Sequence, residues 1–307
     1  MKKSLFYFLS FLLISGGIFA QDEDQANAKT GHKNNNKFKQ LYDEFSTPNM
    51  FRTASGAPGP AYYQQQADYK MDIELDDENA RLSGNETITY TNNSPDELKY
   101  LWVQLDQNMR AKDSKTPLIE GSVSVTSASR FVGSYMKDPF DGGFNIQEVK
   151  DIKGNDLLHM INRTMMRVEL PAPLKSGEQF SFSIKWWYNI NDHVKDGGRS
   201  GYEYFPDTDN RIYVMAQFYP RMAVYSDVEG WQNSQFWGRD EFALTFGNFD
   251  VNITVPADHI LDGTGRLVNR KEVFTKEMMK RYEQAKKSYD EPVKIVTQAE
   301  AEAAEKQ

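Results

Sequence analysis

The sequence contains no cysteine among its 307 residues. This absence excludes disulfides, thiol nucleophiles, thiolate metal sites and a lipid-bearing N-terminal cysteine. Histidine is also scarce, with four residues, and none has a partner at the spacing of a helical metal site, so the signature H-E-x-x-H is missing. A G-x-S-x-G elbow and a phosphate-binding glycine loop are absent as well. We therefore predict no catalytic residue and no metal ligand in this chain.

Positive charge is in deficit. The chain carries 36 Lys and Arg against 44 Asp and Glu, for a formal net charge of −8. An acidic surface repels phosphate backbones, so we expect no nucleic acid partner.

The first 20 residues read as a secretory signal peptide. Lys2 and Lys3 precede an apolar run over 5–13, and small residues lead to Ala20, where we expect cleavage. The apolar run is shorter than the roughly 20 residues that a spanning helix needs. We therefore predict an exported protein, periplasmic or secreted, with no membrane span after signal cleavage.

Composition changes along the chain and predicts its organisation. Residues 21–60 are polar and rich in turn formers, which indicates an N-terminal arm with one short amphipathic helix over 38–45. Residues 61–268 are predicted to form the folded domain. Residues 269–307 are predicted to be a charged helical insertion or linker with an incomplete end.

The central region alternates with a period of two. In YKMDIELD, the residues Tyr69, Met71 and Ile73 share one face, which is typical of a half-buried strand. Turns are predicted at 76–79, 83–85 and 92–96. Further strands are predicted at 122–127, 167–170, 179–188, 211–218, 242–246 and 249–255. The pattern predicts a mainly β protein, an antiparallel β-sandwich, followed by a short charged helix over 272–290 and a strand over 291–296.

Other residues that could take part in a reaction or bind a ligand have simpler structural explanations. The acidic pair Asp207 and Asp209 is predicted to form a turn. Trp186 and Trp187 are neighbours in a predicted strand, so one should face the core and the other the rim.

Residues 61–267 resemble the N-terminal β-domain of the aminopeptidase N-like zinc metallopeptidases, especially their exported Bacteroidetes-type branch. The stretches that carry the resemblance are YKMDIELDDENARLSGNETITYTNNSPDELKYLWVQLDQN (69–108), APLKSGEQFSFSIKWWYNI (172–190) and VMAQFYPRMAVYSDVEGWQNSQFWGRDEFALTFGNFDVNITVPADHILDGTGRLVN (214–269). The resemblance implies a saddle-like β-domain that covers one side of a catalytic cleft.

The resemblance also implies a substrate-binding site in this domain and a zinc site in a separate catalytic domain. The glutamine at the position of Gln217 helps to hold the free amine of the substrate in that family. We therefore predict Gln217, Tyr219 and Arg221 as substrate-binding residues. Zinc is the cofactor of the full-length family member, and peptide substrate would be bound together with a catalytic domain that follows. The zinc motif does not occur by Gln307, so we expect no cofactor in this chain and no catalysis by it alone.

One other class of function stays open on the sequence. A stand-alone periplasmic module that binds carbohydrate or protein would use exposed aromatic residues such as Trp187, Phe236 and Trp237. That hypothesis predicts a closed fold with a contiguous exposed aromatic patch.

Overall fold

The computed structural model describes residues 48–116, 140–239 and 243–304. The described chain is mainly β, with 38% strand and 13% helix, as predicted. It divides into two compact units: a β-domain, which comprises the chain up to Tyr202 and Tyr213–Val255, and a C-terminal unit, which comprises Glu203–Ile212 and Pro256–Gln307. The predicted signal peptide, the helix at 38–45 and the strand at 122–127 lie outside the described residues.

The larger sheet of the β-domain has the strand order β13-β1-β2-β7-β4. Its strands are β1 (Gln66–Asp76), β2 (Arg81–Thr91), β4 (Asn145–Asp151), β7 (Gln179–Asn189) and β13 (Phe249–Thr254). Along β1, the buried residues are the apolar face that alternation predicted, including Tyr69, Met71 and Ile73.

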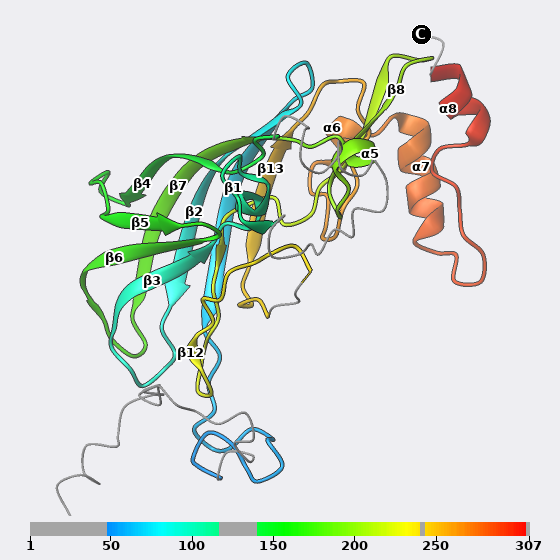
Figure 1. Cartoon of the computed structure of the whole chain (residues 1–307). Helices are drawn as coiled ribbons and strands as arrows, with labels where there is room; N and C mark the ends of the chain where they lie inside the picture. Colours follow the sequence, from blue (N-terminus) through cyan, green and yellow to red (C-terminus); the bar gives the residue numbers. More distant parts are fainter. Residues whose placement is uncertain (1–47, 117–139, 240–242, 305–307) are drawn as a thin grey trace, which may run out of the picture. The chain divides into compact units, whose positions relative to one another are not determined.

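The smaller sheet has the order β10-β3-β6-β5. Its strands are β3 (Leu98–Gln104), β5 (His159–Asn162), β6 (Met165–Leu174) and β10 (Arg221–Met222). Residues of both sheets, such as Ile88 and Phe182 on one side and Leu101 and Val168 on the other, belong to one buried cluster. The β-domain is therefore a sandwich, whose two layers can be followed in Figure 1.

The sandwich is not wholly antiparallel, which corrects the prediction. Strand β13 pairs with β1 in parallel, with Tyr69 opposite Phe249 and Ile73 opposite Ile253. Parallel neighbours need a long connection, and the chain between these two strands is long enough to supply one.

The turn predicted at 83–85 does not form, because β2 runs unbroken from Arg81 to Thr91. Gly84 lies opposite Trp186 in this pairing, and a Cβ atom on Gly84 would come within 2.3 Å of the Trp186 ring. The glycine that resembled a turn signal therefore leaves space for an indole. Trp186 is buried and Trp187 is half-buried over Arg81, as the alternation predicted.

Three predicted strands are wrong in part. The strand predicted at 211–218 is β9 (Asn210–Val214), which ends earlier, and the described part of 242–246 contains only an isolated bridge at Phe246. Residues 291–296 form no strand, because Ile295 instead offers its carbonyl oxygen to Arg281. The predicted turn at Asp207 and Asp209 does form, between β8 (Gly201–Phe205) and β9.

The described end of the predicted arm is anchored rather than free. Arg52 donates two hydrogen bonds to Asp227, at 2.8 and 3.0 Å, and its guanidinium lies over the Tyr62 ring. Asp227 lies between β11 (Tyr225–Ser226) and β12 (Gly230–Trp231), so an ion pair fastens residues 48–60 to this hairpin.

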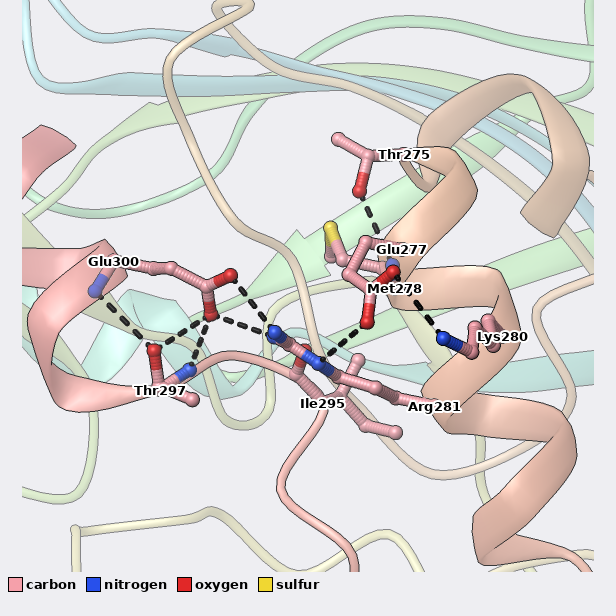
Figure 2. A network of polar contacts seen from close by, with 8 residues as sticks. All are labelled: Thr275, Glu277, Met278, Lys280, Arg281, Ile295, Thr297 and Glu300. Carbon is pink, nitrogen blue, oxygen red and sulfur yellow. Dashed lines mark hydrogen bonds and ion pairs between the residues drawn. The ribbon is translucent and has the colours of Figure 1, made fainter.

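The C-terminal unit contains α6 (Arg270–Val273), α7 (Lys276–Ala285) and α8 (Gln298–Ala304). Helix α7 lies within the charged helix predicted over 272–290. Figure 2 shows the contact that joins α7 to α8: Arg281 donates to both carboxylate oxygens of Glu300, at 2.6 and 3.0 Å. Thr275 caps α7 by accepting a hydrogen bond from the backbone N–H of Met278.

Replacing Gly84 tests the close approach of β2 to Trp186. We expect Gly84→Ala to lower the free energy of unfolding by about 1–3 kcal/mol, because the added methyl group overpacks the core. Gly263→Ala is the control, since a Cβ atom there meets nothing within 4 Å. Urea denaturation of both variants measures the difference, and equal stability would contradict the packing described here.

Acid should loosen the junction of α7 and α8. The Arg281 guanidinium lowers the pKa of Glu300 from its usual 4.5 to about 2. A carboxylate with a lowered pKa stabilises the fold above its unfolded pKa and loses this contribution as the pH falls through its folded pKa. The protection factors of the α8 amides, which correct for the intrinsic slowing of exchange in acid, should therefore fall between about pH 4.5 and pH 2. Glu300→Gln should show fast exchange already at neutral pH, and Glu302→Gln, which leaves Arg281 paired, should not.

Candidate functional site

The candidate site is the strand-end turn, residues 215–220, between β9 and β10. Pro220 cannot donate a ladder hydrogen bond, which favours an interruption of the sheet here. Gln217 has φ +54°, in the left-handed region that residues with a side chain rarely adopt. Its side chain is partly exposed. Such conformations cost about 1–3 kcal/mol and persist where neighbouring contacts enforce them, often at functional sites.

The contacts that hold the strand-end turn come from a 3-10 helix, η1 (Asp106–Arg110), which follows β3. The side-chain amide of Gln107 donates hydrogen bonds to the carbonyl oxygens of Ala216 and Gln217, at 3.2 and 3.1 Å. Gln107 is buried, with 2% of its surface exposed. One side chain therefore fixes two successive peptide groups of the turn.

Arg221 is fixed by a buried ion pair with Asp106. The exposed fractions of the two side chains are 7% and 1%. Burial raises the pKa of Asp106, and the neighbouring Arg221 guanidinium opposes that rise. Because β10 also pairs with β3, with Arg221 opposite Gln104, the end of the strand-end turn is attached both by its backbone and by this charge pair.

Tyr219 is packed among aromatic rings. Its ring lies edge-on to Tyr69, with centroids 5.4 Å apart, and to Phe249, at 6.1 Å. Burial is the main cause that raises the pKa of Tyr219 to about 12, so its hydroxyl stays protonated at neutral pH. Tyr69 in turn accepts a hydrogen bond from the backbone N–H of Met222. Aromatic contacts thus orient the turn from the side of the larger sheet.

The structure brings the three predicted residues together on one short segment but gives them different surroundings. Gln217 is the one on the strained backbone, whereas Tyr219 is held by ring contacts and Arg221 by Asp106. Direct contact between any of them and a substrate stays a prediction.

Sequence reasoning missed the residues that support the turn, Asp106 and Gln107. A signal was present, because the alternation of β3 ends in the polar run Asp106–Asn108 directly after Leu105. Sequence reasoning also missed Glu86, which shares the inward face of β2 with Leu82 and Ile88 and is 1% exposed. Neither carboxylate oxygen of Glu86 has a hydrogen-bond partner among the described residues, and burial raises its pKa well above the usual value.

The side-chain amide of Gln217 offers both a donor and an acceptor to a ligand. Within residues 48–116, 140–239 and 243–304, no three His, Asp or Glu side chains gather in a way that could hold a metal ion. None of the described helices is long and apolar enough to cross a membrane.

The aromatic patch expected for a stand-alone binding module is not assembled as predicted. Phe236 is 6% exposed rather than accessible. Its backbone N–H donates to the Thr164 hydroxyl, and that hydroxyl donates to Gln235, so the segment folds back onto the start of β6. Trp237 is half-buried beside Arg163.

No protein-family model matches the chain, and no curated protein matches it. Among solved structures, the chain is similar to part of a two-domain M1 zinc metallopeptidase bound to L-tryptophan, at 15% identity and a TM-score of 0.33, covering 66% of this chain and 35% of that one. It is also similar to an M1 zinc metallopeptidase from Deinococcus radiodurans, at 14% identity and a TM-score of 0.32, covering 66% and 35%. The same enzyme bound to a Tyr-Ser-Ala substrate matches at 14% and 0.32, covering 64% and 33%. The chain thus spans about a third of the length of these proteins.

The ion pair below the turn can be tested by a double-mutant cycle. We expect Arg221→Met and Asp106→Asn each to destabilise the β-domain by about 3–5 kcal/mol, since each leaves a buried charge without its partner. The double variant should lose much less than the sum, because no lone charge remains. Urea denaturation gives the three free energies of unfolding. Additive losses would show that the two side chains do not act as a pair.

Proposed function

We propose that the β-domain is the N-terminal substrate-cleft domain of an exported zinc metallopeptidase of the aminopeptidase type. The observation that carries the proposal is Gln217, which the sequence resemblance assigns to substrate binding and which has a strained backbone enforced by Gln107. Strain of this kind is retained where a side chain must be presented at a fixed place.

In the proposed role, the Gln217 side-chain oxygen accepts a hydrogen bond from the free amine of a peptide. Tyr219 and Arg221 act as positioning residues, because their own contacts are with Tyr69 and Asp106. Orienting one end of the substrate lowers the entropic part of the activation barrier without any bond making or breaking by this domain. Zinc and its ligands belong to a catalytic domain in the full-length protein.

Export is the second part of the proposal. It is supported by the sequence of residues 1–20, which has the pattern of a secretory signal peptide. Mass analysis of the mature protein should find an N-terminus at Gln21.

Variants at Gln217 in the full-length gene product test the proposed role. We expect Gln217→Ala to lower kcat/KM for an aminoacyl p-nitroanilide by about 10- to 100-fold, which corresponds to the loss of about 1.4–2.7 kcal/mol of transition-state binding. Gln217→Gly should lose as much, although glycine relieves the backbone strain.

The glycine variant separates the two possible roles of Gln217. If the residue only shaped the turn, Gln217→Gly would keep its activity and gain stability. Gln64→Ala is the matched control, since Gln64 is exposed and its side-chain amide donates a hydrogen bond to the Tyr62 hydroxyl. Full activity in both Gln217 variants, or activity that survives complete removal of zinc, would refute the proposal.

A further inference from the structure

Arg110, the last residue of η1, has a guanidinium without a carboxylate partner among the described residues. Arg221 and Arg52 each pair with a buried aspartate in the same domain. By contrast, the hydrogen bond that the Arg110 side chain makes within the described residues runs from Nη1 to Oε1 of Gln107, at 3.3 Å. Arg110 is also partly buried, and desolvation lowers its pKa, against the opposing effects of Tyr188 and Asp196. A guanidinium has five N–H donors, so most of its donor capacity is unused here.

The backbone of Gly198 lies against this guanidinium. A Cβ atom on Gly198 would lie 2.2 Å from Nη2 of Arg110, so the guanidinium packs against bare backbone there. Gly198 has φ +96°, which other residues rarely adopt. The backbone N–H of Gly142 donates to the Arg110 carbonyl oxygen at 2.9 Å, which fixes the main chain of Arg110. A side chain at Gly198 would displace the guanidinium from its position.

The same glutamine connects Arg110 to the candidate site. The Gln107 side chain accepts from Arg110 through Oε1 and donates from Nε2 to the carbonyl oxygen of Gln217. The side-chain amide of Gln107 therefore contacts the Arg110 guanidinium through its oxygen and the strained backbone of Gln217 through its nitrogen.

We propose that Arg110 binds a carboxylate of a peptide, either its C-terminal group or an acidic side chain. A planar guanidinium can donate two parallel hydrogen bonds to a carboxylate, which makes this pairing both strong and geometrically selective. The identification of the ligand as a peptide rests on the proposed function, whereas the preference for a carboxylate rests on Arg110 itself.

The proposal also predicts how Asp196 affects ligand affinity, and this effect is opposite in sign to that of Arg110. Its carboxylate is close enough to raise the pKa of Arg110. The same negative charge must repel an incoming carboxylate. Removing this charge should therefore strengthen binding, which a purely structural role for Arg110 would not predict.

The test is calorimetric titration of the 307-residue chain with three probes: Ala-Ala-Ala as the free acid, its C-terminal amide, and acetyl-Ala-Asp-Ala-amide. The amide should bind least. Binding by the first probe identifies the C-terminal carboxylate as the ligand group, and binding by the third identifies an acidic side chain. Equal affinity for all three, or no binding by either acid, would overturn the proposal.

Four variants complete the experiment. Arg110→Met should weaken binding of the acid probe about tenfold or more, Arg110→Lys should weaken it less, and Asp196→Asn should strengthen it about two- to fivefold. Arg163→Met is the control, because Arg163 is an arginine of the same domain that stacks on Trp237. Circular dichroism checks the fold of each. If Arg110→Met does not fold, the opposite signs of the lysine and asparagine variants still decide, and unchanged affinity in both would refute the proposal.

Hydrolysis does not enter these titrations. If the chain binds the acid probes better than the amide while the Gln217 variants keep full activity, Arg110 is a carboxylate site and the peptidase role is refuted. If the Gln217 variants lose activity while the chain binds acid and amide equally, only the proposal for Arg110 is refuted.

Discussion

The buried ion pair of Asp106 and Arg221 is the interaction on which the candidate site depends. It ties the start of η1 to the start of β10, so that the residues on either side take fixed positions. Gln107 follows Asp106 directly, and its amide reaches the carbonyl oxygens of the strand-end turn. A buried ion pair is weak evidence for net stability, since desolvation offsets much of the attraction. Its role here is geometric, because it holds the start of η1 against the start of β10.

Polar groups in the sandwich core are a second constraint. Glu86 occupies the inward face of β2, where apolar side chains would pack without any desolvation cost. Burial raises the pKa of Glu86 well above its usual value, and neither of its carboxyl oxygens has a hydrogen-bond partner among the described residues. Together with Asp106, it places two acidic residues in a core that hydrophobic burial otherwise stabilises. Both buried acidic residues belong to the β-domain, which also contains the strand-end turn.

Local periodicity was sufficient to predict the mainly β fold, but not its long-range pairing. The alternation of Tyr69, Met71 and Ile73 gave the correct buried face of β1, since a strand with one buried face must alternate. The parallel pairing of β1 with β13 joins segments far apart in sequence, and no local pattern encodes it. Gly84 misled the prediction, because glycine serves equally in a turn and opposite a large side chain.

The candidate site was predictable only in part for the same reason. The resemblance pointed to Gln217, Tyr219 and Arg221, and the interrupted alternation around Pro220 marked a strand end there. What the sequence could not provide was the partner of each residue, because Asp106 and Gln107 lie more than a hundred positions away. Left-handed backbone at Gln217 was equally hidden, since it results from those distant contacts rather than from local preference.

Amide hydrogen exchange in Asp106→Asn tests the central claim most directly. If the ion pair fixes the strand-end turn, protection should fall more across residues 216–222 and η1 than across the central strands β1, β2 and β7. Unchanged protection across the turn, or a uniform loss over the whole β-domain, would contradict the account, because the turn would then owe its conformation to other contacts.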